Sequence, residues 1–481
     1  MINRRGFLAG AAGTVGLAGL AGATGCQRTP VSGGGDQGSL TWWDHSPNLQ
    51  EANKAVWAEY EKAGGLKVEY QYHQTAKLGQ ALQLAKQSNQ LPDVHTNVGL
   101  ELPLPQLIKD GWFQPLELDE GTKAKLGKDS LIDGIHVFDG KPYSFAIQNP
   151  RQYHAANWFN HELIVKAGLD PAAPPKTFDE FREACRTIAK AVPDTYGVIL
   201  NLGMGERIAT QVNHLAVGAG FEGINGVEFA TGEFAFNSEP YLQVMEFLLS
   251  LQTDKLLFPG SSQQDDQTAR VRWATGTIGY FFDGPWCPGS TRKDAAPFFD
   301  KLDVGPMLVP DSSKEVVNYQ GPMGGTFFIS GQSDKAAEAS KVLSLVAGDP
   351  YQVAIADGMA QPPRDMELVK QSAANEPYKR LVEWYADTCY LAPSAALKNP
   401  ATAKVAEEAK PVKPNLAAII QGMFSGDVPD VKKALTTMSD QLAKERDAAI
   451  KKVSAAGTKV SADDYAFPQW KPRQDFTTDL Y

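Results

Sequence analysis

The amino-acid sequence predicts an α/β fold with two lobes and a mostly helical C-terminal part. Near its start, short apolar strands alternate with amphipathic helices, which is typical of a parallel sheet covered by helices. Strands of the same character return far along the chain, around residues 277–282 and 326–330. No Pro/Gly/Ser-rich linker lies between Ser39 and Lys452. We therefore expect the lobes to interleave, with several crossings of the chain between them.

The first lobe is expected to be doubly wound. Residues 39–43 and 67–72 have strand character, 48–63 and 76–88 have helical spacing, and a third strand begins at 91. In open α/β sheets, ligands bind beyond the carboxyl ends of the strands. The residues that follow the first and third strands are therefore candidates for ligand binding: Asp44, His45, Asn97 and Glu101.

The middle of the chain is expected to supply the second lobe. An extended stretch at 141–150 makes the first crossing, and a helix is predicted over 157–168. Thr177, with Glu180 three residues later, indicates a capping box at the start of the next helix. A hairpin is predicted over 226–237, with its turn at Thr231 and Gly232.

Later elements are expected to complete both lobes. A buried strand at 277–282 ends at Asp283, and strands at 304–309 and 326–330 return the chain to the first lobe. The rest is predicted to be largely helical, in segments that include 335–347, 378–388, 415–421 and 431–453.

The first residues have the pattern of an export signal. Arg4 and Arg5 precede a weakly apolar run that ends at small residues before Cys26, in an order that resembles a twin-arginine signal. The residues around Cys26 resemble a lipobox, whose cysteine is lipidated; the alternative is a cleavage site with an incidental cysteine. Residues 26–38 are predicted to be a flexible tether.

Charge and cysteine content narrow the possible partners. The formal net charge of −10 disfavours nucleic acid and anionic lipid headgroups as ligands. No cluster of His and Cys has metal-ligand spacing, so we expect no metal and no cofactor. Besides Cys26, only Cys185, Cys287 and Cys389 are present, far apart, so at most one disulfide is possible among them.

Five short segments in a fixed order resemble one family. They are NWFNHEL (157–163), PPKTFDEF (174–181), GEFAFNS (232–238), WATGT leading to GPW (273–286), and IQG (420–422). Together they resemble the extracellular solute-binding proteins of ABC importers, in the sugar-binding group that includes the maltose-binding protein. The Gly/Phe-rich loop over 321–328 and the aromatic tail over 465–481 depart from the family pattern and suggest a subgroup.

This resemblance implies a periplasmic-binding-protein fold of type II, a Venus flytrap. Lobe 1 is expected over 39–147 plus 308–358, and lobe 2 over 148–307 plus 359–481. The two lobes would close on a carbohydrate, and the membrane subunits of an ABC importer would recognise the closed form. We expect a monomer, which the residues around Cys26 would anchor outside the cytoplasm, and no catalytic activity, because no convincing carboxylate pair or nucleophile is present.

A sugar site needs aromatic planes for the apolar ring faces and planar polar groups for the hydroxyls. We expect Trp43 rather than Trp42 to face the ligand, although both could belong to the core. The resemblance places Trp286 in the groove beside Asp283; the alternative is a proline-fixed turn that only buries the indole.

Further polar candidates lie at the expected crossings and loops. Gln148 and Asn149 could face either the ligand or solvent at the hinge. Gly324 could bring a backbone N–H close to a hydroxyl, or only supply a loop conformation. Arg364 could bind a sugar oxygen, or form a surface ion pair.

Two other functions remain open from the sequence, an exported carbohydrate-active enzyme and a receptor of the same fold for a glycerophosphodiester or peptide. Asp265 and Asp266 are adjacent carboxylates, but their Ser/Gln-rich surroundings indicate a solvated loop. The glycine pattern over 218–223 follows a helical stretch and precedes a hairpin, which is the wrong context for a dinucleotide site. A phosphodiester site would need basic residues where acidic ones stand.

Overall fold

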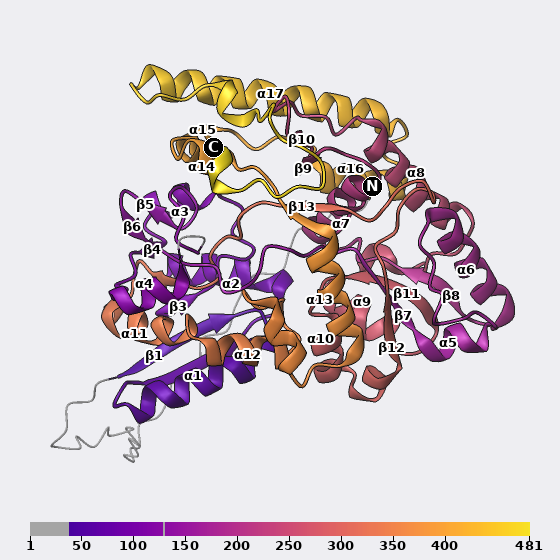
Figure 1. Cartoon of the computed structure of the whole chain (residues 1–481), viewed down its shortest axis with the longest axis horizontal. Coiled ribbons are helices and arrows are strands. Elements are labelled where there is room, and N and C mark those ends of the chain that lie inside the picture. The colour runs from indigo at the N-terminus through magenta and orange to yellow at the C-terminus, as the bar shows by residue number, and fades with distance from the viewer. Residues whose placement is uncertain (1–37, 128–129) are drawn as a thin grey trace, which may run out of the picture. The chain divides into compact units, whose positions relative to one another are not determined.

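The computed structural model describes residues 38–127 and 130–481, and Gly38–Tyr481 form one unit of the chain. The predicted export signal, Cys26 and the start of the predicted tether lie outside the described residues. In the part that is described, no helix combines the length and the apolar character that crossing a membrane requires. Figure 1 shows two groups of strands covered by helices, which we call the first and the second lobe.

The first lobe is built on a five-stranded sheet with the strand order β2-β1-β3-β14-β4. β1 runs parallel to β2 and β3, as the alternation of strands and helices predicts, and β14 is antiparallel to β3 and β4. Helix α1 packs against α11 and α12, which come from much later in the chain. The bounds are β1 Ser39–Asp44, α1 Gln50–Lys62, β2 Lys67–Tyr72, α2 Thr75–Gln87, β3 Val94–His95, α3 Leu104–Lys109, β4 Phe113–Gln114, α4 Glu120–Leu126, β14 Phe328–Ser330, α11 Ala336–Val346 and α12 Asp349–Asp357.

The second lobe is built on a four-stranded sheet with the order β12-β7-β11-β8. β7 is antiparallel to both neighbours, and β8 lies parallel to β11 at the edge. The bounds are β7 Ala156–Asn160, α5 His161–Lys166, α6 Phe178–Ala191, β8 Tyr196–Ile199, α7 Gly205–Gly218, α8 Glu239–Thr253, α9 Asp266–Trp273, β11 Ile278–Asp283, α10 Cys287–Asp294 and β12 Leu302–Gly305. The buried strand predicted at 277–282 is confirmed as β11.

Two predictions for this sheet are wrong. The helix expected from residue 157 begins only at His161, because all five residues of β7 are buried between two strands and Asn160 caps the following helix. The strand expected over 304–309 as part of the first lobe is β12, which pairs with β7 in the second lobe. Its apolar residues Leu302 and Val304 pack into the core of that lobe.

The predicted hairpin forms, and a second hairpin directly precedes it. Within the predicted range, Val227 and Phe234 form an antiparallel bridge, and Gly232 has positive φ at the turn. β9 (Gly223–Ile224) and β10 (Val227–Glu228) are joined by Asn225 and Gly226, both with positive φ. This is the Asn-Gly pair that two-residue hairpin turns prefer, and it forms an additional hairpin before the predicted one. The glycine pattern over 218–223 lies between the end of α7 and this hairpin, as expected.

Each sheet packs against its own buried apolar residues. The second lobe has one large apolar cluster, and the two faces of the first sheet carry separate clusters, with Trp42 in one and Trp43 against the other. The capping box of Thr177 and Glu180 at the start of α6 is confirmed. Cys185, Cys287 and Cys389 are buried free thiols, so the possible disulfide is not present among them.

The chain passes between the sheets several times. It does so between β6 (Lys141–Pro142) and β7, between β12 and β14, and again after α12. The crossing segments pair with one another: Gln148 forms a bridge with Pro363, and β13 (Asn318–Gln320) runs parallel to β15 (Cys389–Leu391). The expected interleaving of the lobes is therefore present.

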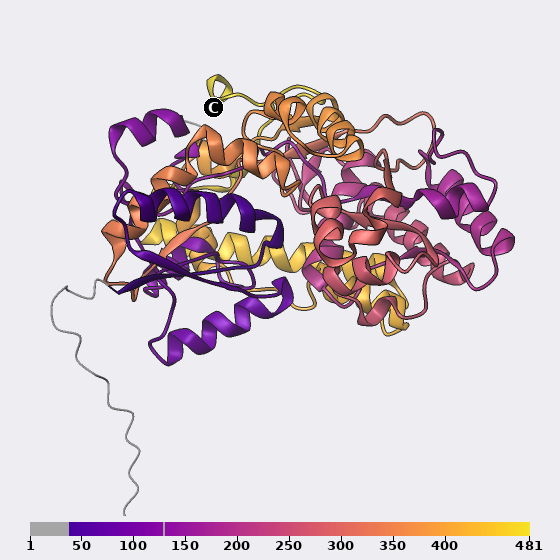
Figure 2. The same cartoon turned by 90° about the horizontal axis from the view of Figure 1, so that it is seen from below.

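The C-terminal part is mostly helical, as predicted. It comprises α13 (Glu376–Thr388), α14 (Ala395–Lys398), α15 (Thr402–Glu408), α16 (Leu416–Ser425) and α17 (Val431–Ala455). α17 packs against α8 and α16 of the second lobe and against α15, which contacts α3 of the first lobe. Figures 1 and 2 show α17 extending alongside both lobes.

Candidate functional site

The carboxyl ends of strands from both sheets meet at one place. The segment after β1 contacts the start of α10, which follows β11. Asn48 donates from Nδ2 to the Trp286 carbonyl at 2.9 Å and to Ser290 Oγ at 3.1 Å. The strand-end rule for ligand binding therefore applies to both lobes at this junction.

The two neighbouring tryptophans of β1 point to opposite faces of the sheet. Trp42 is fully buried and makes edge contacts with Trp57 and Phe327. Trp43 is partly exposed, and its ring lies 4.4 Å from that of His73. Of the two, Trp43 is the one that can offer a surface to a ligand, as the alternation predicts.

Asp44 is fully buried and bonded within the protein. Its carboxylate accepts from Tyr70 Oη at 2.9 Å, from Asn53 Nδ2 at 2.9 Å and from the Ser46 backbone N–H at 3.0 Å. Burial raises the pKa of Asp44 to about 6, against the opposing effect of these hydrogen bonds. Asp44 thus holds the end of β1 and the start of α1 together instead of facing the junction.

His45 follows Asp44 in this loop and is within electrostatic reach of charged residues of the second lobe. Its Nδ1 lies 3.2 Å from Thr96 Oγ1, after β3. Burial lowers the pKa of His45 to about 4, while Asp266 and Arg207 of the second lobe act on it electrostatically in opposite directions. The imidazole is therefore neutral at pH 7.

Asp283 fixes the position of Trp286 instead of standing free. Its Oδ2 accepts from Arg270 Nε at 3.0 Å and NH2 at 2.8 Å, and its Oδ1 accepts from Trp286 Nε1 at 2.8 Å. Asp283 and Arg270 are both buried, so this ion pair is shielded from water. Trp286 is partly exposed, with its indole orientation set by these contacts.

Around Trp286 lies a polar cluster that the sequence did not reveal. The Arg207 guanidinium stacks on the indole at 4.4 Å, and His154 meets its edge at 4.6 Å. Arg207 NH2 lies 3.4 Å from Asp266 Oδ2. The solvated loop expected at 265–266 is wrong: Asp265 caps α9, and Asp266 is buried beside Arg207.

A second histidine extends this cluster toward the hinge. His214 Nδ1 accepts from the His154 backbone N–H at 2.8 Å, and Gln320 of β13 lies 2.8 Å from the other ring nitrogen. Burial lowers the pKa of His214 to about 3, so the ring is neutral. No sequence signal selected Arg207, which lies in the first turn of α7 after the loop that follows β8.

The predicted hinge residues are bonded within the crossing segments. The Asn149 backbone N–H donates to the Pro362 carbonyl at 3.0 Å, and Asn149 Nδ2 donates to the Arg364 carbonyl at 2.8 Å. The Arg364 guanidinium donates to the Ala347 carbonyl at 2.6 Å. Gln148, Asn149 and Arg364 thus join two crossing segments to each other.

The remaining candidates are more open. Asn97 is partly exposed after β3, with its carbonyl accepting from Leu100 N at 3.1 Å, and Glu101 is exposed. Gly324 is exposed, and a side chain at this position would meet no atom within 4 Å. No described residue packs so closely against the backbone of Gly324 that a larger side chain would be excluded.

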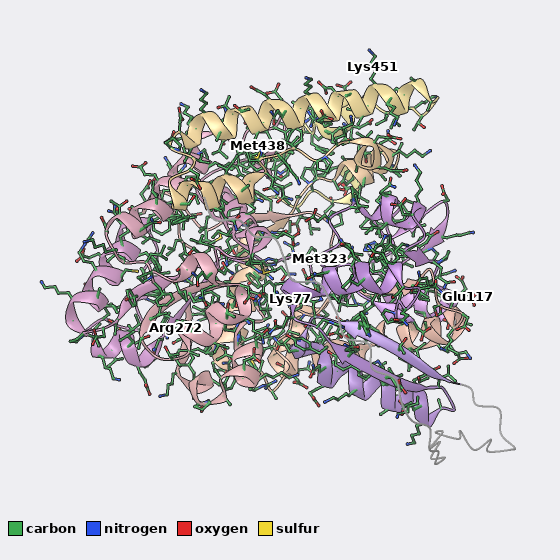
Figure 3. The ribbon with its side chains drawn as sticks, turned by 180° about the vertical axis from the view of Figure 1, so that it is seen from behind. Lys77, Glu117, Arg272, Met323, Met438 and Lys451 are labelled. Carbon is green, nitrogen blue, oxygen red and sulfur yellow. The ribbon has the colours of Figure 1, made fainter. Side chains whose placement is uncertain are left out.

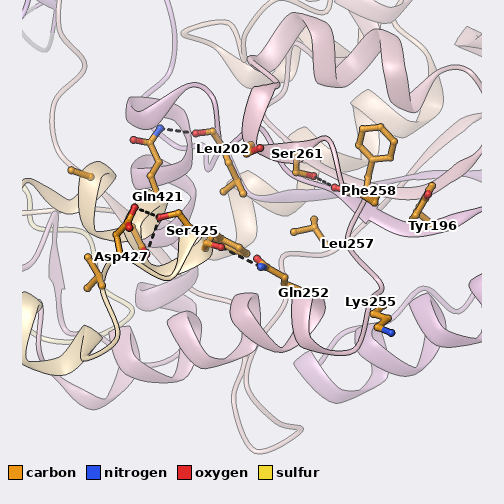
Figure 4. A pocket seen from close by; sticks show the side chains of 16 residues that line it. Tyr196, Leu202, Gln252, Lys255, Leu257, Phe258, Ser261, Gln421, Ser425 and Asp427 are labelled. Atoms are coloured by element: carbon orange, nitrogen blue, oxygen red, sulfur yellow. Dashed lines mark hydrogen bonds between the residues drawn. The ribbon is translucent and has the colours of Figure 1, made fainter. Parts of the chain in front are cut away.

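A pocket of about 1040 Å³ lies on the second lobe, beside the edge strand β8. Figure 4 shows it between the end of α8, the loop around Phe258 and helix α16. Two of its polar lining groups are engaged internally: Gln421 donates to the Leu202 carbonyl, and Ser261 donates to that of Phe258. None of the predicted site residues lines it. Among the described residues, no group of three or more His, Cys, Asp and Glu is arranged to hold a metal.

Comparisons with known proteins agree with this architecture. A solute-binding protein of an ABC transporter from Thermotoga lettingae, bound with α-D-tagatose, matches with a TM-score of 0.62 at 19% identity, over 85% of this chain and 99% of that chain. The GacH receptor of Streptomyces glaucescens matches with 0.61 at 17%, over 85% and 98%. The maltotriose-binding protein of Thermus thermophilus matches with 0.59 at 19%, over 84% and 99%.

A search of curated proteins by sequence gave no match. The sequence profile of the family described as bacterial extracellular solute-binding protein matches residues 44–353, which is more than half of the chain. The structural similarities cover the same region and extend beyond it. The chain therefore belongs to the family of bacterial extracellular solute-binding proteins.

Proposed function

We propose that the protein binds a sugar or oligosaccharide between its two lobes and delivers it to the membrane subunits of an ABC importer. The observation that carries the proposal is the chemistry at the facing strand ends. Trp43 and Trp286 are partly exposed aromatic rings, one from each lobe, and neutral or paired polar groups lie beside them. Stacking surfaces next to hydrogen-bonding groups are what a sugar requires.

Structures with this fold include one bound with α-D-tagatose, one in complex with acarbose and one bound with maltotriose. These ligands are all carbohydrates, which supports the same ligand class here. The lobe boundaries proposed above, 39–147 plus 308–358 and 148–307 plus 359–481, put Trp43 and Trp286 in different lobes. A ligand that contacts both rings would favour the closed form, because only the closed form makes both sets of contacts.

We propose that the site binds without catalysis. Hydrolysis of a glycoside needs one carboxyl group as acid and another as base or nucleophile. At this junction Asp44 and Asp283 are enclosed by internal hydrogen bonds, and Asp266 lies against Arg207. None of these carboxylates is placed as one of an exposed pair.

We further propose export through the twin-arginine route and lipid attachment at Cys26, with the mature protein acting as a monomer. The pattern from Arg4 to Cys26 supports this. Replacing Arg4 and Arg5 by lysine is expected to leave the protein in the cytoplasm, and Cys26→Ala is expected to release it from the membrane fraction. Membrane association of Cys26→Ala at the wild-type level would overturn the anchor.

The test of ligand class is a thermal-shift panel on residues 39–481. The panel contains maltose, maltotriose, chitobiose, D-tagatose and trehalose, with glycerophosphocholine and a tripeptide as non-sugar arms. A ligand at 100 times its Kd stabilises the folded state by about 2.7 kcal/mol, which shifts the melting temperature measurably. At least one saccharide is expected to shift the melt. A shift with glycerophosphocholine or the peptide alone would overturn the sugar assignment.

A further inference from the structure

Arg207 is the charged group that lies most directly against the proposed stacking residue Trp286. It stands in the first turn of α7, directly after the loop that follows β8. Its guanidinium carbon is 4.4 Å from the indole centre, and NH1 is 3.3 Å from His154 Nδ1. A guanidinium plane stacked on an aromatic ring is held in a defined orientation.

The hydrogen-bonding capacity of Arg207 is only partly used. A guanidinium has five N–H donors, and the two contacts of Arg207, at 3.3 and 3.4 Å, are long. Its buried Nε has no partner among the described residues. Arg270 in the same lobe differs, because it makes two short bonds to Asp283 and is almost fully buried. Arg207 keeps 15% of its side chain exposed.

Asp266 stands beside Arg207 with acceptor capacity left. Its carboxylate accepts from the Gln267 backbone N–H, Arg207 NH2 lies 3.4 Å from Oδ2, and 9% of the side chain is exposed. Burial acts to raise the pKa of Asp266, but the charges of Arg207 and Arg270 outweigh it and lower the pKa. Asp266 is therefore a carboxylate at neutral pH, next to a guanidinium that can still donate.

Both groups face the other lobe at the same place. Arg207 and Asp266 act electrostatically on the imidazole of His45, which belongs to the loop after β1. Asn48, three residues further along that loop, donates to the carbonyl of Trp286. The pair thus lies where the two lobes approach each other, beside the proposed stacking ring.

We propose that Arg207 and Asp266 select neutral sugars that carry two adjacent hydroxyl groups over acidic sugars. The proposal rests on the proposed function and names the ligand chemistry of the same site. One hydroxyl oxygen accepts from the Arg207 guanidinium, and the neighbouring hydroxyl donates to Asp266. A uronic acid is attracted by Arg207 but repelled by Asp266, so the pair gives it no net advantage.

The test compares Arg207→Met, Arg207→Lys and Asp266→Asn with wild type by isothermal titration. The probes are the neutral saccharides of the thermal-shift panel and two acidic sugars, glucuronate and galacturonate. The matched control is Arg272→Met. Arg272 also stacks on an aromatic ring of the second lobe, at 4.8 Å from Phe258, which lines the pocket of Figure 4.

We expect Arg207→Met and Asp266→Asn each to weaken binding of a neutral saccharide about tenfold or more, the loss of one charge-assisted hydrogen bond. Arg207→Lys is expected to recover only part of the loss, because lysine cannot stack as a plane. Asp266→Asn is expected to raise the affinity for uronates relative to neutral sugars about tenfold, an effect that a merely structural role would not produce. Arg272→Met is expected to bind within about twofold of wild type.

Two outcomes would overturn the proposal, and they differ from failure of the proposed function. If wild type binds a neutral saccharide and the folded Arg207 and Asp266 variants bind it equally well, the assignment of these residues is wrong. If Asp266→Asn leaves the ratio of neutral to acidic sugar affinity unchanged, the selectivity is wrong. If wild type binds no saccharide at all, the proposed function itself fails. If Arg207→Met does not fold, the binding data of Arg207→Lys and Asp266→Asn test the proposal.

Discussion

At the scale of single residues, the strand ends hold two kinds of polar group. Asp44 and Asp283 are enclosed by internal hydrogen bonds and fix the backbone or an aromatic ring. Arg207 and Asp266 are only loosely paired and keep capacity for a further partner. Buried polar groups that are fully bonded stabilise one geometry, whereas partly bonded groups at a junction are free to bind a ligand.

The enclosed carboxylate of Asp44 makes stability depend on pH. Because burial raises its pKa to about 6, the folded state holds the proton more tightly than the unfolded chain. Its contribution is fully present below about pH 4 and is lost as the pH rises through 6. Relative to Asp44→Asn, wild type is expected to lose about 2 to 3 kcal/mol of unfolding free energy between pH 4 and 7.5. Urea denaturation of both proteins across this pH range measures the difference. The same pH dependence of the unfolding free energy in wild type and Asp44→Asn would contradict the prediction.

The position of a residue after a strand was readable from the sequence, but its burial was not. Asp44 and Asp283 are the last residues of β1 and β11, and His45 directly follows β1, as the sequence indicated. Whether a carboxylate points inward depends on partners from distant segments, such as Tyr70 for Asp44 and Arg270 for Asp283. Local sequence carries no sign of those partners. Asp266 was missed for the same reason, since its neighbour Arg207 lies 59 residues away.

At the scale of elements, the sequence predicted correctly those features whose determining contacts lie within a few residues of each other. The capping box of α6 was read correctly from Thr177 and Glu180, because both groups bond within four residues. The hairpin turn at Thr231 and Gly232 was also read correctly, whereas the preceding Asn225-Gly226 turn was not predicted. β7 was mistaken for a helix because its five buried residues depend on pairing with β11 and β12. Those partner strands begin more than 115 residues later.

The capping box supplies a direct test of an element. Thr177→Ala removes the hydroxyl that accepts from the Glu180 backbone N–H at 3.2 Å. It is expected to lower the unfolding free energy by about 1 kcal/mol, as measured by chemical denaturation. Thr437→Ala, at an exposed position inside α17, is the control and is expected to be neutral or slightly stabilising. Equal effects of the two substitutions would contradict the role of the cap.

At the scale of the whole described unit, the C-terminal tail joins the segments that cross between the lobes. Asp475 accepts from Arg151 NH2 at 2.5 Å and from the Leu391 backbone N–H at 2.8 Å. Trp470 packs on Tyr319 of β13, with ring centres 5.2 Å apart. The aromatic tail, whose role the sequence left open, therefore ties together the first crossing, β13 and β15.

This arrangement predicts that the tail contributes to stability through one carboxylate. Asp475→Ala leaves the Leu391 N–H and the Arg151 guanidinium without their shared acceptor, and is expected to cost about 1 to 3 kcal/mol in urea denaturation. Asp387→Ala, at an exposed position of α13, is the control and is expected to change the free energy by less than about 0.5 kcal/mol. A tail that merely lies on the surface would give the same small change for both.

The central claim is that the two lobes close around a sugar. Lys77 on α2 of the first lobe and Arg272 on α9 of the second are exposed and carry labels in Figure 3. Spin labels on Lys77→Cys and Arg272→Cys report the distance between the lobes by pulsed electron paramagnetic resonance, because the other described cysteines are buried. With the saccharide that shifts the melt, the distance distribution is expected to narrow and shorten. An unchanged distribution at a saturating saccharide concentration would contradict the account.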